Sequence, residues 1–296
     1  MGEIVFTSYL SHGAPTSLVE KTAIHAVYEK LGKILSERGV DTVVISSPHY
    51  IAEGEFEIES REDIPCIQDY YGFPEEMYGY SYQAKNNLDL VSRIVEEAKL
   101  AGLRVRRSES WGLDHGAWLP LYFMFPQREV KVVPVSITAA SPQDHFNFGE
   151  AIHRAVSKGG KTVAVIGTGS PLHRLDLIRF GYYGSEKFEP GEEFDDKLIE
   201  TIRTGDFNKI LGIGREYPAL FHAAAPEGNL NPLFVALGAT DPARFIGRTV
   251  LHEFMYFGVS LVVTLLGAEE GLLDSLVDRA ALHPAKPCES SGERTV

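Results

Sequence analysis

Short, uninterrupted apolar runs rich in β-branched residues are the feature that most constrains the fold of this chain. Four such runs occupy residues 4–10, 42–46, 130–137 and 161–166. Runs of this length are typical of strands buried on both faces, as in a parallel sheet. Segments with helical spacing alternate with them, at residues 15–35, 86–101, 144–157 and 193–204. The alternation predicts an α/β fold, with one αβα domain built on a central, mostly parallel but mixed sheet.

Further strands and a further helix complete this expectation. Three more strands are expected, at residues 55–59, at 103–108 on a sheet edge, and at 254–266. Pro48 cannot donate a ladder hydrogen bond, so the strand that begins at residue 42 should end by Ser47. The segment 226–239 has the pattern of a capped helix.

No Gly/Ser linker, charge block or internal repeat divides the 296 residues. We therefore expect a single catalytic domain over residues 1–283. Residues 284–296, PAKPCESSGERTV, are polar and rich in Pro and Ser, which predicts a disordered tail.

Charge and cysteine content limit the class of protein. A formal net charge of −13 disfavours nucleic acid as a partner and favours a small-molecule substrate. Cys66 and Cys288 are the only cysteines, so we expect no disulfide framework, no thiolate metal site and a cytoplasmic location. The N-terminus lacks a signal-peptide pattern, and the apolar run Phe257–Gly267 is too short to cross a bilayer, so no membrane association is expected.

Two histidines follow apolar runs in the same way. His49 lies just past the run at 42–46 and His12 just past the run at 4–10, each shortly after a serine. In open α/β sheets, ligands bind at the carboxyl ends of the strands. Two histidines delivered to that edge predict a metal or catalytic site. For either residue alone, a solvated loop histidine is the alternative.

Two further histidines lie among small residues. His173 belongs to GTGSPLHRL, which lacks both the Walker A lysine and the spacing of a dinucleotide-binding turn. We expect its glycines to let the backbone approach a substrate, and His173 to act as an acid/base. His115 lies beside Asp114 in GLDHGAW. This pair either closes a turn through local hydrogen bonds or lines the pocket.

Six segments in one order carry a family resemblance. They are SHGAP (11–15), SSPHY (46–50), YYGFPEEMY (70–78), GLDHGAWLPL (112–121), GTGSPLHRL (167–175) and NPLFVALGA (231–239). Together they resemble the class III extradiol ring-cleavage dioxygenases, in particular the DOPA-dioxygenase type related to the catalytic subunit of protocatechuate dioxygenase. The resemblance covers nearly the whole chain.

The resemblance implies one non-haem metal ion, Fe(II) or in some members Zn(II), held by two histidines and a third ligand. His12 and His49 match the two histidine ligands. His173 resembles the acid/base of the family, and His115 resembles a second pocket histidine that contacts the substrate or oxygen. A catechol-type substrate, O2 as co-substrate and a homo-oligomeric assembly are also implied.

The segment 52–83 is rich in tyrosine. A long loop of this kind more often forms a wall over a site than a linker. We expect Tyr70, Tyr71 and Tyr78 to enclose the ring of the substrate, with Tyr71 and Asp114 in contact with it. An interface patch is the alternative for this loop.

The third metal ligand is where the chain departs from the family pattern. The DOPA type has a histidine within His-Pro-Thr-Pro-Asp/Glu-His and the protocatechuate type has a glutamate, whereas this chain has HAAAPEGNLNPL at 222–233. Counting forward from His222 gives Glu227, and counting back from Gly238 gives Asn229. Two imidazoles and a carboxylate form the triad suited to Fe(II), so Glu227 is the expected ligand and Asn229 the expected N-cap of the next helix. The alternative is that Glu227 only caps that helix.

The sequence therefore predicts an extradiol dioxygenase that inserts both atoms of O2 into a catechol-type ring and opens it. Two alternatives remain. One is a metal- or substrate-binding relative without turnover, and the other is a Zn(II)-dependent hydrolase.

Overall fold

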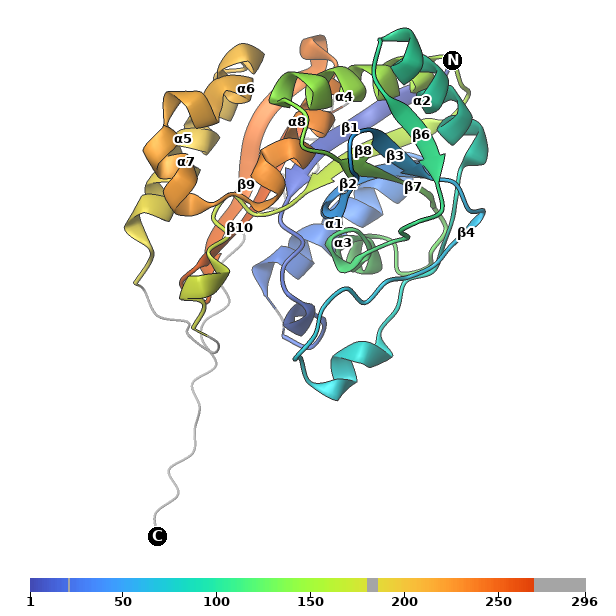
Figure 1. Ribbon diagram of the computed structural model, residues 1–296. Coiled ribbons are helices and arrows are strands. Elements are labelled where there is room, and N and C mark those ends of the chain that lie inside the picture. The colour runs from blue at the N-terminus through green and yellow to red at the C-terminus, as the bar shows by residue number, and fades with distance from the viewer. Residues whose placement is uncertain (21, 180–185, 269–296) are drawn as a thin grey trace.

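The central sheet runs through the whole molecule (Figure 1). The computed structural model describes residues 1–20, 22–179 and 186–268, and within these residues eight strands form one sheet in the order β6-β3-β7-β2-β8-β1-β10-β9. The strands are β1 (Glu3–Leu10), β2 (Thr42–Ile51), β3 (Phe56–Glu59), β6 (Val105–Ser108), β7 (Lys131–Ile137), β8 (Thr162–Thr168), β9 (Phe245–Met255) and β10 (Val259–Ala268). The expected tail at 284–296, and residues 269–283 of the expected domain, lie outside the described residues.

The sheet is mixed and mostly parallel, as predicted. β1 and β2 both pair in parallel with β8, β2 pairs in parallel with β7, and β3 pairs in parallel with β6. Antiparallel pairs join β3 to β7, β1 to β10 and β10 to β9. The strand expected at 103–108 is β6, on one edge. A separate two-stranded ladder joins β4 (Asp63–Ile64) to β5 (Ala84–Lys85).

Helices cover both faces of the sheet (Figure 1). On one face lie α1 (Ala23–Glu37) and α3 (His115–Met124), and on the other α2 (Leu88–Leu100), α4 (Pro142–Ser157) and α8 (Asn231–Gly238). A third group packs beside β9 and α8, formed by α5 (Glu189–Arg203), α6 (Phe207–Glu216) and α7 (Pro218–Ala224). The short 3-10 turns are η1 (Pro15–Leu18), η2 (Glu75–Gly79), η3 (Leu175–Leu177), η4 (Glu227–Leu230) and η5 (Pro242–Arg244). None of the helices in the described ranges is long and apolar enough to span a membrane.

Two strand predictions are wrong in extent. β2 continues through Pro48 to Ile51, but its regular pairing with both neighbours stops at Ser46 and the register to β7 shifts before Ile51. Pro48, which has no backbone N–H, therefore lies where no hydrogen bond between strands is required. The single strand expected at 254–266 is a hairpin of β9 and β10, because Tyr256 and Phe257 adopt positive φ and turn the chain.

One helix prediction is wrong in extent, and one helix was not predicted. The helix expected over residues 15–35 is divided into η1 and α1, and at the start of α1 the Thr22 N–H donates to His25 Nδ1 at 3.3 Å. The GLDHGAWLPL segment, for which no element was predicted, forms α3, with Asp114 as its N-cap. Its apolar residues show no amphipathic stripe because nearly all of them are buried.

Close packing of α1 on α3 fixes the position of the helix that begins at His115. Gly32 of α1 faces the end of α3, and a Cβ added at residue 32 would lie 1.7 Å from the carbonyl oxygen of Met124. The two helices can approach this closely only because residue 32 has no side chain.

We expect Gly32→Ala to lower the free energy of unfolding by about 1–3 kcal/mol, because the methyl group has to push α3 away. Urea denaturation measures this change. Gly160→Ala is the control, since a Cβ there meets nothing within 4 Å. Equal stability of the two variants would contradict the packing described for α1 and α3.

Candidate metal centre and catalytic pocket

Four histidines meet at one edge of the sheet. β2, β8 and β1 are neighbours and run in parallel, so their carboxyl ends coincide. His12 follows β1, His49 lies near the end of β2, and His173 is in the loop after β8. His115 begins α3, and its ring centroid lies 5.2 Å from that of His12 and 4.4 Å from that of His49. The structure thus brings together the histidines that the strand-end pattern singled out.

The histidines converge on Glu227, whose side chain is only 6 % exposed. Its carboxylate oxygens lie 3.0 Å from His12 Nε2, 3.0 Å from His49 Nε2 and 3.4 Å from His173 Nε2. The backbone N–H of Ser170 donates to Oε2 at 3.1 Å. Burial acts to raise the pKa of Glu227, but its electrostatic interactions with His12 and His173 and the hydrogen bonds from His12 and His49 outweigh burial and hold this pKa well below its usual range.

A left-handed turn directs Glu227 towards the histidines. Gly228, Asn229 and Leu230 have φ values of 56°, 54° and 63°. The prediction that Asn229 caps α8 is wrong, since Leu230 is the N-cap residue and no side chain caps the helix. Asn tolerates the left-handed region, whereas Leu is strained there. Asn229 lines a separate cavity, to which Phe234 also contributes.

His12, His49 and Glu227 form a suitable donor set for one metal ion. One ligand atom from each lies within 4.8 Å of the other two. Two ligand atoms 90° apart at about 2.1 Å from an ion are about 3.0 Å apart, which matches the separations between the Glu227 oxygens and both imidazoles. Two imidazoles and one carboxylate suit Fe(II) and leave further coordination positions open. Asn229 does not take part.

Asp69, which the sequence analysis missed, orients two of the histidines. Its carboxylate oxygens lie 2.9 Å from His49 Nδ1 and 2.9 Å from His115 Nδ1. The backbone N–H of His115 also donates to Asp69, at 2.7 Å. The Ile67 N–H donates to the Leu113 carbonyl at 2.8 Å and the Leu113 N–H donates to the Pro65 carbonyl at 2.9 Å, and these bonds hold the loop against the start of α3. Because Asp69 engages the Nδ1 atom of His49, the Nε2 atom is left for a metal, the usual support of a histidine ligand.

The protonation of these groups follows from their surroundings. Burial acts to lower the pKa of His49, but the carboxylates of Asp69 and Glu227 outweigh it and raise this pKa to about 11. Burial also acts to raise the pKa of Asp69, yet its hydrogen bonds to His115 and His49 hold it far below the usual range. Burial lowers the pKa of His115 and that of His173, so both rings are neutral near pH 7.

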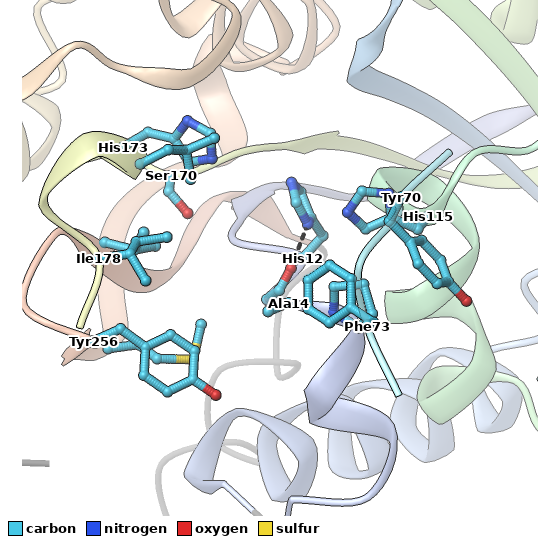
Figure 2. A pocket seen from close by; sticks show the side chains of 14 residues that line it. His12, Ala14, Tyr70, Phe73, His115, Ser170, His173, Ile178 and Tyr256 are labelled. Carbon is cyan, nitrogen blue, oxygen red and sulfur yellow. Dashed lines mark hydrogen bonds between the residues drawn. The ribbon is translucent and has the colours of Figure 1, made fainter. Parts of the chain in front are cut away.

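A cavity of about 200 Å³ opens beside the histidines (Figure 2). It is lined by His12, Gly13, Ala14, Pro15, Tyr70, Phe73, His115, Ser170, His173, Leu175, Ile178, Met255, Tyr256 and Val259. Its walls are therefore mainly apolar, with three imidazoles on one side.

The tyrosine predictions are met only in part. Tyr70 lines the cavity, with its ring centroid 5.3 Å from that of His115. Tyr71 is 91 % exposed and does not line the cavity, so its position contradicts the predicted contact with the substrate. Tyr70 and Tyr71 lie in a stretch without regular secondary structure, so the sequence pattern gives no direction for either side chain. Tyr78 packs against Tyr70 and does not itself line the cavity.

Asp114 supports the site from within the protein. Its carboxylate accepts hydrogen bonds from Ser47 Oγ at 2.6 Å, Trp111 Nε1 at 2.9 Å and the backbone N–H of Ala117 at 3.2 Å. It does not line the cavity. The prediction of a substrate contact therefore does not fit its position, and the alternative of a turn closed by local hydrogen bonds does.

The glycines of GTGSPLHRL allow close packing, while their predicted approach to a substrate stays a prediction. A Cβ at Gly167 would lie 2.1 Å from the carbonyl oxygen of Pro232 in the first turn of α8. A Cβ at Gly169 would lie 3.2 Å from the Tyr9 hydroxyl and 3.5 Å from Glu227 Oε2. Because these positions have no side chain, α8 and the turn that carries Glu227 can pack closely against the end of β8.

Comparison with known proteins identifies the family. A profile of the family described as "Catalytic LigB subunit of aromatic ring-opening dioxygenase" matches residues 6–264 of the chain. The chain belongs to this family. The resemblance drawn from the six sequence segments is thereby confirmed.

Several relatives carry the names of dioxygenases. A Schizosaccharomyces pombe protein named 4,5-DOPA dioxygenase extradiol-like protein is 28% identical over 274 residues, which cover 85% of this chain and 91% of that protein. The 4,5-DOPA dioxygenase extradiol of Escherichia coli K12 is 29% identical over 243 residues, covering 79% and 84%. A 3,4-dihydroxyphenylacetate 2,3-dioxygenase of Escherichia coli is 24% identical over 227 residues, covering 75% and 81%. The names of these relatives support an oxygenase that cleaves aromatic rings.

The crystal structure of an uncharacterized Escherichia coli K12 protein shares the fold. It superposes with a TM-score of 0.69 at 20% identity, covering 89% of this chain and 100% of that chain. The predicted α/β fold is thus confirmed.

We expect His12→Ala and His49→Ala to abolish retention of a bound metal ion, because each removes one of only three proposed ligands. Glu227→Gln keeps the size of the side chain but removes its charge, and should weaken metal binding strongly. Metal content after dialysis measures both effects. His222→Ala, at an exposed position on α7, is the control. A variant that keeps stoichiometric metal would remove its residue from the ligand set.

Metal affinity should rise by up to about tenfold per pH unit between about pH 6 and pH 8, because the ion has to displace the proton that the raised pKa keeps on His49. Asp69→Asn removes one carboxylate that raises this pKa. The variant should therefore release fewer protons for each ion that it binds, and its affinity for the metal ion should fall about 10- to 100-fold. Calorimetry with Zn(II) in buffers of different ionisation enthalpy measures both quantities. Asp89→Asn, on the exposed side of α2, is the control. A wild-type affinity independent of pH would refute this account.

Proposed function

We propose that this protein is a metal-dependent extradiol dioxygenase that opens a catechol-type aromatic ring with O2, incorporating both oxygen atoms. One observation carries the proposal. A 2-His-1-carboxylate donor set, His12, His49 and Glu227, stands beside an aromatic-lined cavity in a member of a ring-opening dioxygenase family. The named relatives act on DOPA or 3,4-dihydroxyphenylacetate, which both carry two adjacent ring hydroxyls.

Fe(II) is the proposed resident ion, with Zn(II) as the alternative, because the donor set is that of non-haem iron oxygenases. When bound, the ion would orient the substrate oxygens and O2 and pass electron density between them. The protein would hold it through His12, His49 and Glu227, with Asp69 fixing the ring of His49.

His173 is the proposed acid/base. Its burial keeps the ring neutral near pH 7, so its Nε2 atom can accept the proton of a catechol hydroxyl and return one during ring opening. The ring lines the cavity and lies 3.4 Å from Glu227. The Glu227 carboxylate then stabilises the imidazolium while it holds that proton.

His115 is proposed to orient the substrate or oxygen. Asp69 can only accept, so the Nδ1 atom of His115 carries the proton and Nε2 is an acceptor in the neutral ring. Tyr70 and Phe73 continue the wall beside this ring, and they would pack on the aromatic ring of the substrate and keep water from it (Figure 2).

Anaerobic loading with Fe(II), followed by addition of O2 and a catechol, tests the proposal. We expect one O2 consumed per ring-opened product. Ester cleavage by the Zn(II) form without oxygen uptake would instead favour a hydrolase, and neither activity would favour a binding protein without turnover.

His173→Ala should keep its metal and still bind a catechol, while the rate of ring opening falls about 10²- to 10⁴-fold. Stopped-flow oxygen consumption measures the rate and metal analysis the content. The exposed His222→Ala variant should keep the wild-type rate. Loss of metal from His173→Ala would make this residue a ligand and not the acid/base.

A further inference from the structure

The cavity has a second wall, opposite Tyr70 and Phe73 (Figure 2). It is formed by the loop after β8 together with the turn of the β9–β10 hairpin. The Arg174 N–H donates to the Gly258 carbonyl at 2.7 Å, and the Arg179 N–H donates to the Tyr256 carbonyl at 3.0 Å. The two segments therefore form one unit, and their inward side chains make one continuous surface.

The lining away from the histidines is apolar, and the cavity that it encloses is small. It includes Pro15, Phe73, Leu175, Ile178, Met255 and Val259. At about 200 Å³ the cavity is smaller than the roughly 300–1,000 Å³ of pockets for drug-sized ligands. This volume suits a single ring with a short substituent.

No lysine or arginine lines this cavity among residues 1–20, 22–179 and 186–268. The two arginines that flank the lining have other partners. Arg174 binds the Asp176 carboxylate at 2.7 and 2.6 Å and the Ala223 carbonyl at 3.0 Å. Arg179 lies over the ring of Phe257, 4.1 Å from its centroid, and faces Glu186. The described wall thus offers a substrate carboxylate no cation.

Carboxylates, not cations, lie beside the cavity. The hydroxyl of Tyr256, which lines the cavity, donates to the Glu20 carboxylate at 2.8 Å. Glu227 and Asp69 lie at the histidine side, where imidazoles already pair with both carboxylates. A carboxylate on the substrate would lose water and find no cation in the described wall to pair with.

Resting on the proposed function, we propose that the substrate is a single-ring catechol with a short, uncharged and apolar substituent. Carboxylated catechols, such as the DOPA and 3,4-dihydroxyphenylacetate of the named relatives, are disfavoured. The apolar wall would favour uncharged substrates because it offers no cation to pair with a substrate carboxylate.

Binding to the Zn(II)-loaded protein under argon tests this preference without turnover. The ligands are 4-ethylcatechol, 3,4-dihydroxyphenylacetate and the methyl ester of that acid, measured by calorimetry. We expect the ester and 4-ethylcatechol to bind about tenfold or more tightly than the acid. Equal or tighter binding of the acid, or binding of none of the three, overturns the inference. If the uncharged ligands bind preferentially but the Fe(II) form opens no ring, the proposed function fails while the preference stands.

A cation added to the wall should change the preference. Leu175 lines the cavity yet is 60 % exposed, so Leu175→Arg can keep its charge in water. It should improve affinity for the acid about fivefold or more relative to the ester, because the new guanidinium pairs with the carboxylate. Leu175→Gln is the matched control and should leave the ratio unchanged. An unchanged ratio in Leu175→Arg, or the same change in both variants, contradicts the assigned role of this wall.

Discussion

A buried carboxylate governs the arrangement of the rest of this site. A charge removed from water is strongly unfavourable unless partners surround it. Glu227 is 6 % exposed, and its partners are three imidazoles and one backbone N–H. In the metal-free protein, a proton on His49 balances part of this charge. A divalent cation placed between the same atoms would replace that proton and balance the Glu227 charge instead. The carboxylate therefore requires a positive charge beside it in either state.

The fold satisfies this constraint through several independent features. Parallel strands bring His12 and His49 to one edge, and Gly167 lets α8 approach that edge closely enough to place Glu227 between them. Asp69 pairs with Nδ1 of His49, and Asp114 accepts hydrogen bonds from Ser47 and Ala117, so both carboxylates support the histidine side without engaging the Nε2 atoms. The backbone is strained at Leu230, where the chain turns after Glu227. Strain at that point is consistent with a functional demand on the turn.

Much of the sheet could be predicted because buried parallel strands leave a strong apolar signal in the sequence. The histidines at strand ends were recognisable for the same reason, since topology brings those ends together. The end of β2 and the limits of α3 could not be predicted from the sequence, because tertiary packing decides the conformation of Pro48 and of the residues of α3. Asp69 was missed because it lies in a loop without periodicity, although its place directly before YYGFPEEMY was a usable signal. Tyr71 and Asp114 were misassigned because one sequence cannot show which way a loop side chain points.

The central claim is that one carboxylate and two imidazoles hold the metal, with His173 outside the ligand set. X-ray absorption spectroscopy on the Fe(II)-loaded protein, compared with Glu227→Gln and His173→Ala loaded in the same way, tests this most directly. The account predicts two imidazoles in wild type, an unchanged imidazole count in His173→Ala and weak or absent iron in Glu227→Gln. Three imidazoles in wild type, with one lost in His173→Ala, would contradict it.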